Sequence, residues 1–254
     1  MIDLKGNKAF VPYIMAGDGG METLKEKLLY LQECGAAAIE IGIPFSDPVA
    51  DGPTIQKAGI RALKEGTTLK MVLNDIRAYK EEISIPLILM TYLNPIVAYG
   101  LEKFAEDASE AGISGCIIPD LPLEEEDFIL PMLDRNELSL IRLVTITTPD
   151  QRIREIASRA TGFIYAVTVA GITGARNDFS EELTDFLQNV KSLSTVPVMA
   201  GFGISSAEQV VEICKYCDGV IVGSKIVDLF HQGEKEEIKR LVGSIKGVNQ
   251  NILA

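Results

Sequence analysis

Two acidic residues, Glu40 and Asp51, stand where packing alone does not explain them. Glu40 lies in a short apolar run, residues 37–43, in which isoleucines alternate with small residues. In a β-strand this alternation places the isoleucines on one face and Glu40 on the other, the face that would line a barrel interior. A carboxylate buried there needs a partner or a function. Asp51 follows in the loop beyond the carboxyl end of the same strand, so the two carboxyl groups can converge on one cavity as an acid–base pair.

Structural explanations compete with this interpretation for both residues. A structural Glu40 needs a buried cation, and among the predicted strands only the one at 139–146 offers a candidate, Arg142. Functional use of Glu40 is therefore favoured, and burial is expected to raise its pKa. Asp51 precedes a Gly-Pro dipeptide and also fits an ordinary turn or a helix N-cap. Further aspartates follow predicted strands with no spacing that favours them as catalysts: Asp18, Asp47 and Asp120.

Composition narrows the class of protein. The chain has 254 residues, of which 47% are hydrophobic and 24% charged, enough for a core of α/β-barrel size or for two smaller domains. Its formal net charge of −12 disfavours a nucleic-acid or anionic-membrane partner, because either would require clustered Lys and Arg. The first residues lack the apolar core of a signal peptide, and no apolar run reaches the ~18 residues of a membrane span. We therefore expect a cytoplasmic protein.

Cysteine and histidine usage limits the chemistry further. The four cysteines, at positions 34, 116, 214 and 217, are too scattered for a disulfide framework, so reduced thiols are the default. Cys214 and Cys217 form a CxxC, but no second pair follows, which disfavours a zinc or redox role. The single histidine, His231, excludes most Ser/His and Cys/His mechanisms and any multi-histidine metal site. No metal site is predicted.

Short apolar runs alternate with amphipathic stretches eight times, which is the strongest indication of the fold. The expected strands are 9–15, 37–43, 86–92, 115–119, 139–146, 162–167, 197–201 and 219–223. Helical patterns lie between them, for example at 22–33, 69–82 and 234–245, and the Glu124–Glu126 run fits the acidic first turn of a helix. Apolar strands each followed by a helix predict parallel pairing, and eight such units predict a closed (β/α)8 TIM barrel. Without a linker or a composition shift, we predict one α/β domain over residues 1–254.

Glycines gather in the loops after the later strands, where barrel enzymes carry their catalytic groups. Gly203, Gly223 and Ser224 follow expected strands seven and eight, where barrels commonly bind phosphate with backbone N–H groups and a helix N-terminus. A turn or a helix cap explains any one of these residues, but the three together favour a phosphate-binding site. Lys225 either adds a charge to this site or is a solvated helix residue. The segment 169–179 suits a lid over bound substrate, or a merely flexible connection. No predicted strand carries a lysine, which argues against a Schiff-base aldolase.

Several sequence blocks in one consistent order resemble the tryptophan synthase alpha chain family over about residues 10–245. The blocks are IEIGIPFSDPVADGPTIQ at 39–56, YLNPI at 92–96, PDLPLEE at 119–125, VAGITG at 169–174, GFGIS at 201–205 and VGS at 222–224. That family cleaves indole-3-glycerol phosphate to indole and glyceraldehyde 3-phosphate, a retro-aldol reaction without a cofactor of its own. The resemblance implies that Glu40 protonates C3 of the indole ring and handles the glycerol hydroxyl proton. It also implies that Asp51 stabilises charge developing at the indole nitrogen.

The resemblance implies roles for the rest of the site as well. It puts Tyr165 near the acid–base group and Thr173 of the lid near Asp51. Apolar contacts to the indole are implied for Tyr13, Ile55, Met90, Tyr92, Ile117 and Phe202. Phosphate contacts are implied for Gly174, Gly203, Gly223 and Ser224. The chain departs from the common family pattern at Met15, Gly19 and Ala170, which bears on loop dynamics and partner contacts rather than on chemistry.

The same resemblance implies a tryptophan synthase beta chain as partner, in an alpha2beta2 heterotetramer. Pyridoxal phosphate is expected in the beta partner and no cofactor in this chain, whose substrate is a phosphorylated small molecule. Residues 44–53 and Asn94–Pro95 would face the partner, which receives indole through a tunnel. Two other functions stay open: a free-standing lyase that releases indole without a beta partner, and a non-catalytic phosphate-binding subunit that regulates another enzyme. Retention of both Glu40 and Asp51 speaks against the second.

Overall fold

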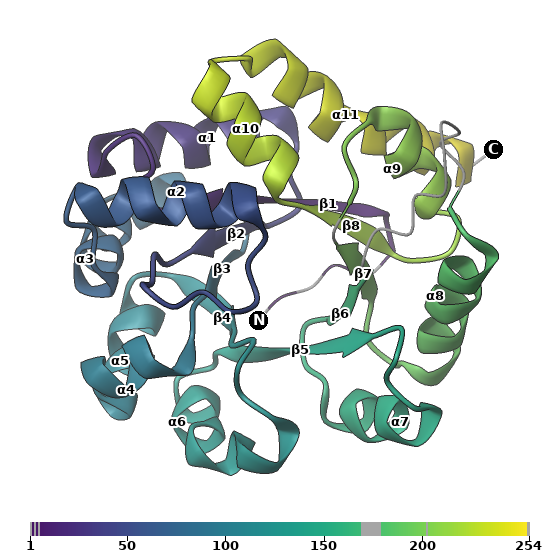
Figure 1. Cartoon of the computed structure of the whole chain (residues 1–254), viewed down its shortest axis with the longest axis horizontal. Coiled ribbons are helices and arrows are strands. Elements are labelled where there is room, and N and C mark those ends of the chain that lie inside the picture. The colour runs from purple at the N-terminus through teal and green to yellow at the C-terminus, as the bar shows by residue number, and fades with distance from the viewer. Residues whose placement is uncertain (1, 3, 5, 169–178, 202, 253–254) are drawn as a thin grey trace.

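Eight parallel strands close into a barrel in the described part of the chain, and helices surround it (Figure 1). The structure is a computed structural model that describes residues 2, 4, 6–168, 179–201 and 203–252, with side chains through Asn249. Each strand pairs with its successor in the sequence, and the last strand closes on the first through the register pairs Ala9–Gly219 to Pro12–Val222. The predicted (β/α)8 barrel is confirmed.

The strand bounds lie within two residues of those predicted. The strands are β1 (Ala9–Met15), β2 (Ile39–Gly42), β3 (Leu87–Met90), β4 (Ile113–Ile117), β5 (Ser139–Thr145), β6 (Ile164–Val167), β7 (Val198–Gly201) and β8 (Gly219–Val222). The fourth strand lies two residues earlier than the predicted 115–119. Proline lacks the N–H that a strand ladder needs, so β4 ends before Pro119 and the chain turns there.

Helices or 3-10 turns follow the strands. The α-helices are α1 (Leu24–Cys34), α2 (Pro53–Lys64), α3 (Leu69–Tyr79), α4 (Leu93–Tyr99), α5 (Leu101–Glu110), α6 (Leu130–Arg135), α7 (Asp150–Arg159), α8 (Glu181–Leu193), α9 (Ala207–Ile213), α10 (Ser224–Gln232) and α11 (Lys235–Ile252). The 3-10 helices are η1 (Met21–Thr23), η2 (Lys80–Glu82) and η3 (Leu123–Phe128). The predicted helix at 22–33 therefore begins with a 3-10 turn, and the one at 69–82 ends with one.

Local sequence explains how the longer helices start, pack and stop. In α3 the hydroxyl of Thr68 accepts a hydrogen bond from the Met71 N–H at 3.2 Å, which caps the first turn. The residues at helical spacing that the sequence marks as apolar are buried against the barrel: Leu69, Val72, Leu73 and Ile76. Helix α1 stops at Gly35, whose φ of 97° is a left-handed conformation that glycine adopts without strain.

The apolar core has two layers. Ile39, Ile41 and Ile43 belong to the layer between the strands and the helices, whereas Ala38 belongs to the layer inside the barrel. This alternation confirms that Glu40 lies on the inner face of β2. Ile2 and Leu4 also pack into the inner layer, near the start of β6, so the N-terminal segment closes the amino-terminal end of the barrel.

The acidic run after β4 lies in the first turn of a helix, as predicted, and this helix is the 3-10 helix η3. The third residue of the run, Glu126, is only 3% exposed. Glu126 accepts two hydrogen bonds from the guanidinium of Arg142, at 2.7 and 2.8 Å. Arg142 lies on the outer face of β5, between strand and helices, because its neighbour Ile141 faces the barrel interior.

The described residues contain neither a membrane-spanning helix nor a cluster of metal-binding side chains. None of the helices there combines the length and apolar character that a membrane-spanning segment needs. Within the same residues, no group of three or more His, Cys, Asp or Glu side chains is arranged to hold a metal ion.

Candidate active site

Glu40 is buried inside the barrel with an unsatisfied oxygen. It lies on β2 opposite Tyr13 on β1 and Ile88 on β3, and it is 2% exposed. Its Oε2 atom has no hydrogen-bond partner among the described residues. Burial, and secondarily the charge of Asp51, raises the pKa of Glu40 to about 8. At neutral pH this side chain is therefore mainly a carboxylic acid, able to donate a proton.

Arg142 is not a structural partner that neutralises Glu40. Arg142 was the candidate within a predicted strand, and its guanidinium is held by Glu126 and by the carbonyl of Arg159, 2.5 Å away. A buried charge that is fully paired on the outer face of the sheet cannot also neutralise a group inside the barrel. The absence of a cation at Glu40, within the residues described, is what favours a chemical use for it.

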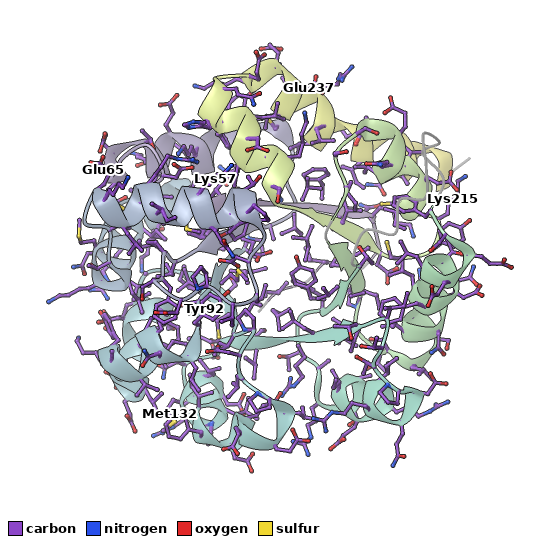
Figure 2. All side chains as sticks on the ribbon, in the orientation of Figure 1. Lys57, Glu65, Tyr92, Met132, Lys215 and Glu237 are labelled. Carbon is purple, nitrogen blue, oxygen red and sulfur yellow. The ribbon has the colours of Figure 1, made fainter. Side chains whose placement is uncertain are left out.

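Asp51 lies at the rim of the same cavity, in the loop between β2 and α2. Burial raises its pKa to about 6, although a hydrogen bond with Tyr92 acts in the opposite direction. The Tyr92 hydroxyl also accepts a hydrogen bond from the N–H of Ala50 at 2.9 Å, which fixes this loop against β3; Figure 2 shows Tyr92 beside the loop. The N-cap of α2 is Gly52, so Asp51 is not the helix cap that the sequence left open.

The other loop aspartates are occupied by structural contacts. Asp18 forms a bidentate ion pair with Arg61, at 2.6 and 2.7 Å. Asp120 accepts a hydrogen bond from the N–H of Leu93, and Asp47 accepts one from the neighbouring Ser46 hydroxyl. These contacts distinguish them from Glu40 and Asp51, whose pKa values burial raises.

Two tyrosine rings lie near Glu40, and two glycines make room for them. A Cβ atom at Gly42 would collide with the ring and hydroxyl of Tyr13, and one at Gly201 would collide with the ring of Tyr165. Both phenols are buried, which raises their pKa values well above the usual range, and the charge of Glu40 contributes to this. The tyrosines therefore stay neutral and act as apolar walls with a polar tip.

Glu40 and Asp51 share one cavity of about 280 Å³ at the carboxyl end of the barrel. Of the remaining predicted residues, those that line it are Tyr13, Ile55, Met90, Tyr165, Gly203, Gly223 and Ser224. Tyr92 and Ile117 are buried nearby without lining it. Thr173, Gly174 and Phe202, with most of the predicted lid 169–179, lie outside the described residues.

The part of the cavity lined by Gly203, Gly223 and Ser224 is suited to an anion. Gly203 has a φ of 79°, which only glycine adopts easily, and Gly223 is the N-cap of α10. Ser224 is the first residue of that helix, so N–H groups without helical partners point toward the cavity mouth. The backbone here supplies donors and a positive helix end for a phosphate group.

Sequence reasoning missed several lining residues: Gly52, Ile204, Ser205, Ile221 and Asp228. The period of a strand and that of a helix could have indicated two of these residues. Ile221 is two residues before Gly223 on β8 and so shares its face, and Asp228 is four residues after Ser224 on α10 and so shares its side. Lys225, left open between charge and solvation, also lines the cavity.

A parallel barrel in which two carboxyl groups of different pKa share one cavity with the start of a helix defines an acid–base type of site in a (β/α)8 enzyme. Comparison with known proteins gives the family. The sequence profile described as "Tryptophan synthase alpha chain" matches residues 2–252. The chain belongs to the tryptophan synthase alpha chain family.

Individual relatives agree with this assignment. The chain is 53% identical to the tryptophan synthase alpha chain of Bacillus thuringiensis subsp. konkukian, with 95% of this chain and 93% of the relative covered. It is 54% identical to that of Bacillus cereus over the same shares. A crystal structure of tryptophan synthase subunit alpha from Legionella pneumophila superposes with a TM-score of 0.86 at 36% identity, covering 96% of this chain and 93% of that one. The alpha subunit of this family is a lyase that cleaves indole-3-glycerol phosphate, and its beta partner makes tryptophan.

Proposed function

We propose that this chain, as a single domain, cleaves indole-3-glycerol phosphate to indole and glyceraldehyde 3-phosphate with Glu40 and Asp51 as its catalytic residues. One observation carries the proposal: two carboxyl groups share one cavity and burial raises their pKa values to different levels, about 8 and about 6. At neutral pH the pair is therefore one acid and one carboxylate, which is the combination that a retro-aldol cleavage of an indole substrate requires.

Each step of the reaction then has a group of the right charge. Neutral Glu40 donates its proton to C3 of the indole ring, and the Asp51 carboxylate stabilises the positive charge that develops at the ring nitrogen. The carboxylate formed at Glu40 next accepts the proton of the glycerol hydroxyl. The bond between the indole C3 and the glycerol carbon breaks, which releases indole and leaves an aldehyde. Glu40 ends the cycle protonated, as it began.

The remaining residues bind the substrate at its two ends. Tyr13, Ile55, Met90 and Tyr165 form apolar walls for the indole, with Tyr92 and Ile117 supporting them and Phe202 added from the family resemblance. Gly203, Gly223 and Ser224 bind the phosphate, with Gly174 of the lid, and Thr173 approaches Asp51 when the lid closes. This arrangement aligns the scissile bond with Glu40.

The partner in this proposal is a tryptophan synthase beta chain in an alpha2beta2 complex. It carries the pyridoxal phosphate, whereas this chain needs no cofactor, and the assembly works in the cytoplasm. Exposed apolar residues at the carboxyl end of the barrel support such an interface: Val49, in the loop that carries Asp51, is 84% exposed, and Val97 on α4 is 46% exposed. Solved relatives include tryptophan synthase from M. tuberculosis, with a TM-score of 0.85 at 31% identity.

The first test replaces the acid without changing its shape. Glu40→Gln should abolish indole formation from indole-3-glycerol phosphate while glycerol 3-phosphate still binds with an affinity close to that of the unaltered chain, because the phosphate end is untouched. Calorimetry measures the binding and indole absorbance the turnover. Glu65→Gln, an exposed position that follows α2, is the matched control and should keep full activity. Near-normal turnover by Glu40→Gln would rule out the proposed mechanism.

The second test separates a subunit from a free-standing lyase. Indole formation is measured with and without a stoichiometric amount of a beta chain. A rise of at least tenfold is expected, because closure of the loop that carries Asp51 completes the site. Equal and rapid turnover in both samples would favour the free-standing enzyme.

A further inference from the structure

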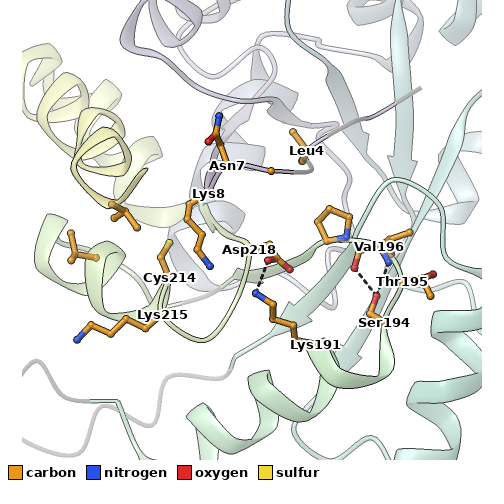
Figure 3. A pocket seen from close by; sticks show the side chains of 14 residues that line it. Leu4, Asn7, Lys8, Lys191, Ser194, Thr195, Val196, Cys214, Lys215 and Asp218 are labelled. Carbon is orange, nitrogen blue, oxygen red and sulfur yellow. Dashed lines mark hydrogen bonds and ion pairs between the residues drawn. The ribbon is translucent and has the colours of Figure 1, made fainter. Parts of the chain in front are cut away.

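A second cavity, of about 760 Å³, lies at the opposite, amino-terminal end of the barrel from the proposed active site. Its walls come from the N-terminal segment, the end of α8, the start of β7 and the end of α9. Lys8 and Cys214 lie side by side on one wall, whereas Lys191 forms an ion pair with Asp218 at 2.7 Å (Figure 3). The barrel reaction uses none of these groups.

The cysteine of this wall has a second cysteine next to it. Cys214 is the C-cap of α9, and Cys217 follows in the turn that leads into β8. Both side chains are buried, and Cys214 lines the cavity. The Cys217 thiol donates to the carbonyl oxygen of Gly219 at 3.1 Å. The Cys217 Sγ atom lies 3.3 Å from the carbonyl oxygen of Ile213, so the turn folds Cys217 back over the end of the helix that carries Cys214.

Positive charge near the pair favours the thiolate form. The Lys8 ammonium group donates a hydrogen bond to the Cys217 carbonyl at 2.6 Å. Interaction between the two thiols lowers the pKa of Cys217 and raises that of Cys214, burial raises both pKa values, and the Lys8 charge lowers both. Cys214 lines the cavity, so it is the thiol that a hydroperoxide meets first.

We infer that Cys214 and Cys217 form a reversible disulfide when the protein meets a hydroperoxide that enters through the amino-terminal cavity. The thiolate of the pair attacks one peroxide oxygen, the O–O bond breaks, and water leaves, which gives a sulfenic acid. The second thiol attacks that sulfur, the S–S bond forms, and a second water leaves with its proton. Two thiols lose two electrons in all, and hydrogen peroxide is reduced to two waters. A dithiol reductant reverses the step.

The other two cysteines lack these features and serve as internal controls. Cys116 is buried in the strand β4 without a second thiol beside it, and burial raises its pKa to about 12. Cys34, at the end of α1, has no second cysteine in that helix, and burial raises its pKa too. A hydroperoxide should therefore react with Cys214 and Cys217 first.

The chain offers an unambiguous test by mass spectrometry. Trypsin cleaves after Lys215, between the two cysteines, so the disulfide would link the peptides 192–215 and 216–225, which contain no other cysteine. The full chain is treated with an excess of hydrogen peroxide, and the thiols that remain free are alkylated. The chain is then digested with trypsin and the peptides are analysed. We expect the linked pair, lighter by two hydrogen atoms and separated again by dithiothreitol, with Cys34 and Cys116 alkylated. Alkylated Cys214 and Cys217, irreversible sulfinic or sulfonic acids there, or links that involve the other cysteines would overturn the proposal.

Variants test the contribution of the pair and of Lys8. Cys214→Ser and Cys217→Ser should each abolish the linked product, whereas Cys34→Ser should leave it. Lys8→Gln should slow the loss of free thiols roughly threefold to tenfold, because the thiolate fraction falls with each unit of pKa. Lys215→Gln is the control, since this lysine is paired with Glu212 and points away from Cys214 in Figure 3. Equal slowing in both lysine variants, or thiol loss only after the circular dichroism signal of the fold has disappeared, would contradict the inference.

Discussion

At the scale of single residues, the proposed chemistry depends on how far burial separates the pKa values of two carboxyl groups. Glu40 lies deep inside the barrel and Asp51 at its rim, so the same physical cause, desolvation, raises the first pKa to about 8 and the second only to about 6. Different depth thus suits one carboxyl group to the proposed role of proton donor and the other to that of charge stabiliser.

The pH dependence of activity follows from these two groups. The proposed reaction needs protonated Glu40 and ionised Asp51, so kcat/KM should rise through about pH 6 and fall through about pH 8. Initial rates of indole formation at subsaturating substrate check this profile. The substrate phosphate also titrates near pH 6. Asp51→Asn distinguishes titration of Asp51 from titration of the substrate phosphate. The fall in kcat/KM below about pH 6 should disappear from the residual activity of this variant. If the fall persists, it belongs to the phosphate.

Ionisation of the buried Glu40 should lower the stability of the folded chain at high pH. The pKa of Glu40 is about 4.5 when unfolded and about 8 when folded, so between these values the folded chain holds a proton that the unfolded chain has lost. The contribution of Glu40 is therefore fully present below pH 4.5 and is lost as pH rises through 8. Glu40→Gln, which cannot ionise, should be more stable than the unaltered chain at pH 9, by on the order of 4 kcal/mol, and nearly equal to it at pH 4. Urea unfolding at both pH values measures the difference, and equal stability at pH 9 would contradict it.

At the scale of elements, the ends of strands shape the site. Strands β2 and β7 both end in glycine, and these are the positions where the rings of Tyr13 and Tyr165 need space. A glycine that a strand tolerates poorly is here the condition for placing a large ring beside the acid. The 3-residue and 4-residue periods of α10 and the 2-residue period of β8 then bring Ser224, Asp228 and Ile221 to the same cavity.

Gly42→Ala tests this packing. The added Cβ collides with Tyr13, so we expect the free energy of unfolding to fall by about 1–3 kcal/mol and kcat to fall with it. Gly243→Ala is the matched control, since it lies within α11 with open space around it and should stabilise the chain by about 0.5–1 kcal/mol without a change in kcat. Chemical denaturation and steady-state kinetics of both variants decide, and an unaffected Gly42→Ala would mean that Tyr13 moves aside freely.

At the scale of the whole molecule, the outer layer is held by apolar packing and by a buried ion pair. Glu126 and Arg142 connect η3 to β5, and the Arg142 guanidinium also reaches the carbonyl of Arg159 at the end of α7. Both side chains are about 5% exposed or less, so neither charge can be solvated if its partner is removed.

Removal of either partner should therefore lower the free energy of unfolding substantially. Glu126→Gln is expected to lower the free energy of unfolding by about 3–5 kcal/mol, because a buried guanidinium loses its counter-charge. Glu212→Gln removes a partner from the exposed pair with Lys215 and should cost less than about 1 kcal/mol. Urea unfolding at neutral pH compares the two. Similar small losses in both variants would show that the Glu126–Arg142 pair is effectively solvated.

The sequence by itself determined the order of strands and helices, the closed parallel barrel and the inward face of Glu40. These follow from local rules: alternation along a strand fixes the face of Glu40, and repeated strand–helix units fix the topology. Local spacing left the role of Asp51 ambiguous, and the resemblance to the family made it a catalytic candidate.

Only the tertiary structure decided which groups meet. It paired Arg142 with Glu126 on the outer face, left the inner carboxyl oxygen of Glu40 without a partner among the described residues, and brought Ile221 and Asp228 to the cavity. It also placed Cys214 of the CxxC, at the end of α9, in the wall of a second cavity. Such contacts depend on strand tilt, on depth of burial and on which distant segments pack together, and no local pattern in the chain contains that information.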